Sequence, residues 1–302
     1  MIGLREVGQL EFLAQVINGL QLGLVYALIA LGYTMVYGIV KLINFAHGDV
    51  FMVGAFIGYF GFTYWGFPFP LAVLTSMVVC SLLGVTIERV AYKPLRYAPK
   101  IAALISAFGM SLFLEYFCSL KFVFGPNFRV VKRPFEEVYW HLGGLTISNI
   151  QVTIFIVVVV MLIILQYLIY RTKTGMAMRA VSVDHNTARL MGVNVDNTIS
   201  ITFAIGSAFA ALGGVLYSVA YPQIYPFMGI MPGLKAFTAA VLGGIGIIPG
   251  AVLGALIMGQ VETMTSAYLS SQLRDAIAFG ILILVLLIRP TGILGRTETE
   301  KV

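Results

Sequence analysis

The ionisable side chains that could carry chemistry are few, and most lie in or beside apolar stretches. They are Glu88, Glu115, Lys235 and Glu262. If these stretches cross a membrane, such residues are the usual markers of a functional site. Glu88 adjoins Arg89 at the end of its stretch, which favours a local ion pair, or snorkelling of the side chain to the interface, over a role in transport. The sequence holds no chain of acids and no arginine ladder, and this disfavours a proton pump or a voltage-gated channel.

Signatures of catalysis and of metal binding are absent from the sequence. The three histidines, His47, His141 and His185, are scattered. Cys80 and Cys118 lie in apolar stretches without a C-x-x-C spacing, so we interpret them as small core residues. There is no G-x-x-x-x-G-K-[ST] loop for ATP. We therefore predict no catalytic residue, no metal site and no cofactor in this chain.

The composition is that of a membrane protein. Of 302 residues, 59% are apolar and 11% are charged, whereas a soluble domain carries about 25% charged residues. The net charge of +6 could suggest nucleic acid, but the basic residues cluster beside apolar stretches and are better explained by membrane topology. The composition excludes a free soluble domain and a disordered chain, and it predicts an all-α polytopic membrane protein.

Stretches without charge, divided at Gly and Pro clusters, define about eight transmembrane elements in a single domain, residues 1–302. A Gly-rich element is counted as a hairpin or broken helix. The expected elements are 12–38, 46–64, 70–88, 101–124, 151–170, 199–220, the Gly-rich 234–262, and 275–289.

Basic residues orient these elements. They concentrate in the loop 89–100, in the loop 171–197 and in the C-terminal tail with Arg289, Arg296 and Lys301. The positive-inside rule places all three in the cytoplasm. The N-terminus is then outside, the C-terminus is cytoplasmic, and the mixed-charge loop 121–150 is external.

A polar segment, Leu42–Asp49, interrupts the apolar pattern after the first element. Asn44 and Asp49 are suited to cap a helix, and Gly48 loosens the backbone. Asn44, His47 and Gly48 are therefore candidates for the translocation pathway. Non-helical backbone at membrane depth is tolerated only inside protein or beside a water-filled cavity. From the residues alone, an ordinary interfacial turn with a capped helix is the favoured interpretation.

The segment 234–250 is the strongest local anomaly. Four glycines and a proline fall within eight residues: Gly243, Gly244, Gly246, Pro249 and Gly250. A straight helix would lose about 1 kcal/mol per Gly and 3 per Pro, so we predict a broken or re-entrant element, and the four glycines are pathway candidates. The alternative is close helix packing, which Gly250-x-x-x-Gly254 also fits. Leu at Gly243 and Gly244 is expected to block transport while leaving assembly intact.

The cytoplasmic loop 171–197 is predicted to contain a short helix. Asp184 can cap a helix from His185 to Met191, with Gly192 just beyond its end. One apolar face is expected, made by Val181, Val183, Ala188 and Met191. Such a helix can lie on the membrane or dock in a partner's groove, and the residues alone leave both open.

Several long motifs resemble the permeases of high-affinity branched-chain amino acid ABC transporters. They extend from residue 20 to the C-terminus in the family's order. The motifs are Gly32–Gly38, Ile43–Asp49, Ile87–Arg96, Lys235–Gly246 and Pro290–Arg296. The resemblance implies a transport subunit of the bacterial inner membrane, not an enzyme, with a second related permease, two ATPase subunits that bind ATP and Mg, and a periplasmic binding protein as partners. Such a subunit is surrounded by membrane lipid and has no nucleic acid partner.

The resemblance also favours docking on a partner over lying on the membrane for the segment 180–192 of the cytoplasmic loop. In ABC importers a loose E-A-A-x-x-x-G pattern carries the helix that couples to the ATPase. This chain keeps the last Ala and the Gly of that pattern. The coupling residues that the resemblance implies are Asp184, Asn186, Thr187, Ala188, Arg189 and Gly192.

The leading hypothesis is import of leucine, isoleucine and valine. The same machine with urea or short amides as cargo is the closest alternative, because related permeases share these motifs. An ion-coupled secondary transporter is an alternative of a different class, and it predicts uptake without ATPase partners. A membrane-embedded enzyme would need a catalytic cluster that the sequence lacks.

Overall fold

A computed structural model describes residues 4–96, 98–142 and 144–295. Within these ranges the chain forms eleven α-helices, four short strands, a π-helical turn at Glu88–Tyr92 and a 3-10 turn at Lys93–Leu95. The helices are α1 (Leu4–Val40), α2 (His47–Thr63), α3 (Phe69–Ile87), α4 (Lys100–Ser119), α5 (Asn149–Arg171), α6 (Lys173–Val183), α7 (His185–Leu190), α8 (Val195–Ala220), α9 (Ile230–Gly243), α10 (Ile248–Tyr268) and α11 (Arg274–Ile288).

The expectation of an all-helical, polytopic membrane protein is confirmed. Five of the described helices, α1, α3, α4, α5 and α8, are long and apolar enough to cross a membrane. The shorter helices α2, α9 and α11 have 17, 14 and 15 residues. Arg296 and Lys301 of the basic tail lie outside the described residues.

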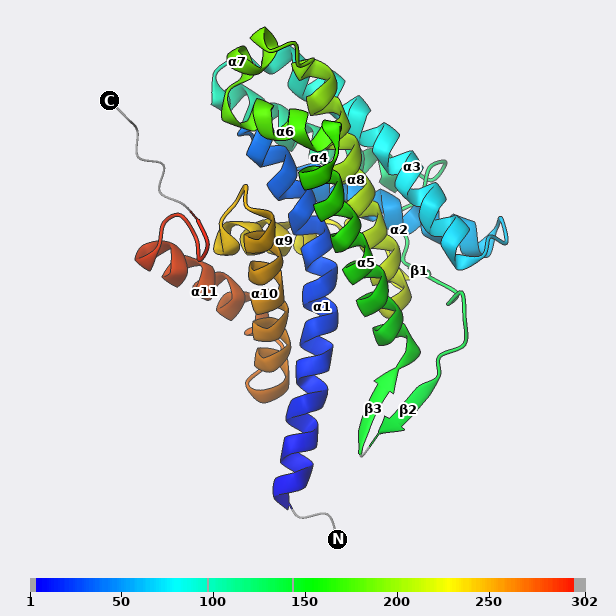
Figure 1. Cartoon of the computed structure of the whole chain (residues 1–302). Coiled ribbons are helices and arrows are strands. Elements are labelled where there is room, and N and C mark those ends of the chain that lie inside the picture. The colour runs from blue at the N-terminus through cyan, green and yellow to red at the C-terminus, as the bar shows by residue number, and fades with distance from the viewer. Residues whose placement is uncertain (1–3, 97, 143, 296–302) are drawn as a thin grey trace.

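The two ends of the molecule differ (Figure 1). The helices α6 and α7 lie at one end, which we call the α7 end. The β2–β3 hairpin and the start of α1 lie at the opposite end, which we call the hairpin end. The long helix α1 runs between these ends through the middle of the molecule. It packs along α10, α8 and α9.

The loop 121–150 contains strands that the sequence did not predict. The strand β2 (Tyr139–Leu142) pairs antiparallel with β3 (Leu145–Ser148), and β1 (Arg129–Val130) pairs with β4 (Gln223–Ile224). The helix expected to reach residue 124 ends at Ser119, because a tight turn follows in which Gly125 N–H donates to the Leu120 carbonyl.

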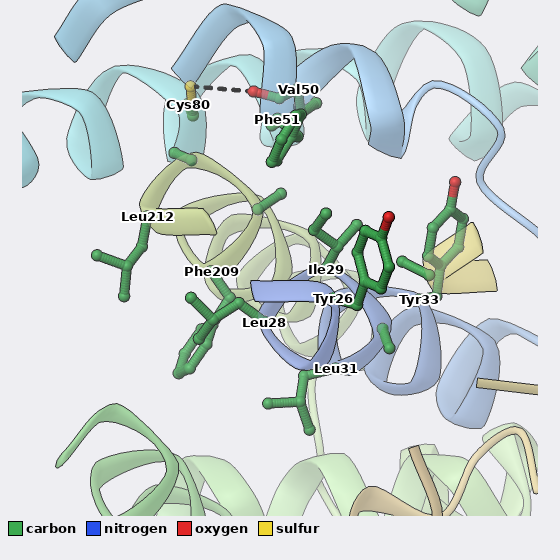
Figure 2. Close-up of a cluster of buried hydrophobic side chains, with 14 of the residues drawn as sticks. Tyr26, Leu28, Ile29, Leu31, Tyr33, Val50, Phe51, Cys80, Phe209 and Leu212 are labelled. Carbon is green, nitrogen blue, oxygen red and sulfur yellow. Dashed lines mark hydrogen bonds between the residues drawn. The ribbon is translucent and has the colours of Figure 1, made fainter. Parts of the chain in front are cut away.

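The core centres on the middle of α1, which is buried on all sides. Leu28, Ile29 and Leu31 are fully buried there, and Phe51 of α2 and Phe209 of α8 lie in the same cluster (Figure 2). A helix that is apolar on all sides must be enclosed by other helices, and α1 is accordingly the central helix of the bundle.

The two cysteines belong to this apolar interior, as expected. Both are buried and free. The Cys80 thiol donates to the Val50 carbonyl at 3.7 Å (Figure 2).

Glu88 forms an ion pair, but its partner is not the adjacent Arg89 that we considered. Its carboxylate is fully buried, forms an ion pair with Arg96 and accepts a hydrogen bond from Ser200 of α8 at 2.7 Å. The π-helical turn that begins at Glu88 carries the chain toward Arg96, which a reading of sequence neighbours does not anticipate. The hydrogen bond from Ser200 joins α8 to the turn that follows α3.

Candidate functional site

The short helix predicted in the loop 171–197 is present as α7; it begins at His185 as predicted and ends at Leu190, one residue before the predicted Met191. The Asp184 carboxylate accepts hydrogen bonds from the backbone N–H groups of Asn186, at 3.3 Å, and Thr187, at 2.8 Å. Gly192 follows with φ of +83°, the left-handed conformation expected beyond a helix end. The bonds from the Thr187 hydroxyl and N–H hold the pKa of Asp184 below its ordinary value, so the cap is charged above that pKa and is lost only as the pH falls through it.

The four residues that we expected on one apolar face of α7 are divided between a buried and an exposed side. Ala188 is 4% exposed and Val181 of α6 is buried, so both pack inside the chain. Val183 and Met191 were expected on the same face, but they are 87% and 80% exposed. Leu190, which was not among the expected residues, is also 87% exposed. The helix therefore has an inner contact and a separate apolar surface that this chain leaves uncovered.

His185 anchors α7 to the central helix. Its Nε2 atom lies 2.9 Å from the carbonyl oxygen of Ile39, in the last turn of α1. A carbonyl only accepts, so Nε2 carries the proton. The preceding helix α6 is fixed in turn by its N-cap Thr172, which accepts from Gly175 N–H at 3.1 Å. Sequence reasoning missed this anchor, since the 146 residues between the partners leave no local signal.

The Gly-rich segment is broken, as predicted. Helix α9 ends at Gly243 and α10 begins at Ile248. Gly244 has φ of +111° and Gly246 of +93°, conformations that an L side chain rarely adopts. The C-terminal segment closes the end of α9, because Leu294 N–H donates to the Gly243 carbonyl at 3.0 Å.

Close packing explains two of the four glycines that we predicted in the pathway. A Cβ atom placed on Gly243 would lie 1.8 Å from the carbonyl oxygen of Gly250, and one on Gly250 would lie 2.5 Å from the Gly243 oxygen. The α9 and α10 backbones therefore touch. The alternative that we raised for Gly250-x-x-x-Gly254 applies, since Gly254 also faces the backbone of Ala239.

A cavity of about 560 Å³ lies at the α7 end, beside the break. Gly246 and Pro249 line it together with Thr34 and Gly38 of α1 and Arg179 of α6. The Thr34 hydroxyl is buried without a hydrogen-bond partner among the described residues. Of the seven pathway candidates, Gly246 is the one that lines this cavity, and all seven remain predictions as pathway residues.

The segment before α2 is partly buried, with Asn44 and Ala46 fully buried, and the side-chain cap that we expected is not formed. Asn44 and Asp49 do not cap α2, whose N-cap is Ala46. Instead, the Asn44 side chain accepts from the Tyr92 hydroxyl at 3.0 Å, and the Asp49 carboxylate accepts from Ser111 of α4 at 2.5 Å. Asn44 and Asp49 form hydrogen bonds with residues distant in the sequence, and so they do not form the cap that the local sequence predicts.

The other two candidates in this segment make close contacts with α1 and α9. The His47 ring packs edge-on against Tyr33, with 4.7 Å between ring centroids. Both ring nitrogens of His47 are buried without a hydrogen-bond partner in the described part of the chain. Gly48 faces the backbone of Gly229 and Gly233. The start of α2 thus packs against the middle of α1 and the start of α9.

Lys235 and Glu262, which flank the broken segment, form a buried ion pair. The Lys235 ammonium lies 2.7 Å from Glu262 Oε1, and the Tyr26 hydroxyl donates to Oε2 at 2.9 Å. Asp275 of α11 lies 2.8 Å from the same ammonium, and Arg274 Nε lies 3.2 Å from Glu262. The sequence singled out the first two residues, and packing adds the others. The network joins α1, α9, α10 and α11.

Removing one partner of this pair should be costly. We expect Lys235→Met to lower the free energy of unfolding by about 3–5 kcal/mol, because Glu262 would keep a buried charge without its main counterion. Adding Glu262→Met should restore most of that loss. Thermal unfolding of the purified protein in detergent checks both, and an unchanged midpoint in the single variant would contradict the expectation.

Comparison of the sequence with known proteins identifies a family of membrane transport proteins. The sequence profile described as "Branched-chain amino acid transport system / permease component" matches residues 15–286. The chain is 45% identical to the high-affinity branched-chain amino acid transport system permease protein LivH of Escherichia coli K12, over 97% of this chain and 98% of that protein. It is equally similar to BraD of Pseudomonas aeruginosa, with 45% identity over the same shares.

A more distant relative has a related name. It is a probable branched-chain amino acid transport permease protein of Methanocaldococcus jannaschii, 30% identical over 89% of this chain and 88% of that protein. No solved structure matches the chain. The matches cover the broken Gly-rich element and the α7 loop as well as the long helices. The chain belongs to the family of permease components of branched-chain amino acid transport systems.

Proposed function

We propose that this chain is the permease subunit of an ATP-driven importer that carries leucine, isoleucine and valine across a bacterial inner membrane. As a permease component it is a transport subunit and not an enzyme, and nucleotide binding lies in partner ATPases. The basic loop that contains α7 supports a cytoplasmic α7 end. The hairpin end, with the start of α1, then faces the periplasm, which agrees with an N-terminus outside and a cytoplasmic C-terminus.

The exposed apolar surface of α7 carries the proposal. Leu190 and Met191 project from a capped helix that the chain itself leaves uncovered. A surface of this kind fits a groove on a partner protein. We assign it to an ATPase subunit, with Asn186, Thr187 and Arg189 on the exposed part of the same helix.

The anchoring of α7 gives the coupling a physical route. Closure of two ATPase subunits on ATP would push on a stiff helix, and His185 joins that helix to Ile39 at the end of α1. One residue earlier in α1, a Cβ atom on Gly38 would lie 3.6 Å from Gly246 in the break. Movement of α7 would therefore reach the cavity at the α7 end through α1.

The family implies the partners and surroundings of the complete transporter. They are a second related permease, two ATPase subunits, a periplasmic binding protein that delivers the cargo, and membrane lipid around the bundle. A binding protein that captures the amino acid explains why a permease of this kind works without a deep high-affinity site of its own.

ATP hydrolysis by the complex purified through a tag on this chain tests the proposal. Binding protein loaded with leucine is expected to raise the hydrolysis rate above that with unloaded binding protein. Stimulation by urea alone would move the cargo to urea and short amides. If no ATPase were copurified while the proteoliposomes still took up leucine, an ion-coupled transporter would replace the proposal.

A further inference from the structure

A second cavity lies at the hairpin end, on the opposite side of the molecule from the break. Its volume is about 560 Å³. Residues from α1, α5, α8, α10, α11 and the β2–β3 hairpin line it. Three of them carry charge: Glu137 before β2, Glu262 of α10 and Arg274 of α11. The cavity therefore brings a guanidinium and two carboxylates together in one site.

The guanidinium is only partly engaged. Both ion pairs of Arg274 run through its Nε atom, at 3.2 Å from Glu262 Oε1 and 3.5 Å from Asp275 Oδ1. Nε is the Arg274 atom that lies nearest to each carboxylate, and the side chain is 43% exposed, so its terminal amino groups are within reach of a ligand in the cavity. A guanidinium offers paired donors that match the two oxygens of a carboxylate. Arg274 is thus suited to bind the carboxylate of a ligand.

The carboxylates and the apolar lining complete the site. Glu262 is held rigid by Lys235 and Tyr26, and Glu137 is held by Arg133 and Ser148. Acceptors fixed in this way suit an ammonium group without reorganisation. Leu22, Ile150 and Ala267 add apolar surface to the same cavity.

We propose that this cavity receives a zwitterionic α-amino acid on the periplasmic side, with its carboxylate on Arg274, its ammonium on the carboxylates of Glu262 and Glu137, and its side chain against Leu22 and Ile150. The inference rests on the proposed function, which supplies an amino acid at this end of the chain. A neutral amide would offer no charge to the guanidinium or to the carboxylates, and a simple carboxylic acid would offer no ammonium to the carboxylates. The site therefore selects for both charges at once.

Protection of an engineered thiol tests this site without relying on transport. Ser266 lines the cavity and is exposed, whereas the nearby Ser271 is exposed and does not line it. Cys80 and Cys118 are buried, so Ser266→Cys and Ser271→Cys each present one accessible thiol. A charged, membrane-impermeant thiol reagent is applied to the whole complex in proteoliposomes without ATP.

Leucine is expected to slow labelling of Ser266→Cys by about fourfold at three times its Kd, and to leave Ser271→Cys unaffected. Leucinamide and 4-methylpentanoate, which each lack one charge, should protect far less. Adding Arg274→Gln should abolish protection by leucine. Lys132→Gln makes the same change of charge at an exposed position outside the cavity and should preserve protection.

Equal labelling with and without leucine would overturn the inference, as would equal protection by 4-methylpentanoate. The leucine-stimulated ATP hydrolysis of the same Ser266→Cys preparation is measured separately. Stimulation without protection rejects the cavity and leaves the proposed function standing. Protection without stimulation supports the cavity and rejects the ATP-driven mechanism.

Discussion

A Leu190→Glu, Met191→Glu double variant is expected to lose the ATPase subunits during purification. Each apolar side chain buried at an interface contributes about 1.5–3 kcal/mol, so removing two should cost roughly 3 kcal/mol or more, about a hundredfold in affinity. The two new carboxylates would add a desolvation cost at the same place. Copurification on a tagged permease, followed by ATP-dependent leucine uptake in proteoliposomes, measures the result.

The permease itself should remain folded in this double variant, because both side chains are more than three-quarters exposed and contribute little to the chain's own core. Val130→Glu provides a control: it also places a Glu at a highly exposed apolar residue, in the loop 121–150 and away from α7. The control should keep its ATPase. Normal copurification by the double variant would remove the surface of α7 from the ATPase interface.

Local chemistry explains what the sequence predicted well. The ends of α7 follow from Asp184 and Gly192, because a cap and a left-handed residue act on the backbone within three or four residues. The break after Gly243 follows in the same way from the backbone freedom of Gly244 and Gly246. Such signals survive folding because neighbours in the chain stay neighbours in the structure.

Long-range packing determines the hydrogen-bond and ion-pair partners that could not be predicted from the sequence. Asn44 was expected to cap α2, but it bonds Tyr92, 48 residues away. Glu88 was expected to pair with Arg89, yet it pairs with Arg96 across a π-helical turn whose presence the sequence does not indicate. Polar side chains in an apolar bundle take whichever partner the packing brings nearest, so their partners require the fold.

The charged residues of the hairpin end show the same limit. Lys235 and Glu262 could be selected as rare intramembrane charges, but nothing in their spacing indicates that Asp275 and Arg274 complete the network. The cavity that contains Glu262 and Arg274 is built from six separate elements. A site assembled in this way has no local sequence pattern.

The structure changes our expectation for Gly243. We predicted that Leu at Gly243 and Gly244 would block transport and spare assembly, but a Cβ atom on Gly243 would lie 1.8 Å from the backbone oxygen of Gly250. Backbone cannot rotate away as a side chain can, so even Gly243→Ala must separate α9 from α10. Overpacking costs about 1–3 kcal/mol and occasionally more, and a clash with backbone belongs at the upper end of that range.

Gly243→Ala is therefore expected to lower the thermal unfolding midpoint of the purified permease by roughly 5 °C or more, and to reduce the yield of monodisperse protein in detergent. Gly280→Ala in α11 is the matched control, since a Cβ atom there would meet nothing within 4 Å. Alanine is the better helix former by about 0.5–1 kcal/mol, so the control should unfold at the same temperature or slightly higher. If Gly243→Ala kept its midpoint and yet stopped leucine uptake, Gly243 would act in the pathway as first predicted, and the contact between α9 and α10 would have to be loose enough to admit a methyl group.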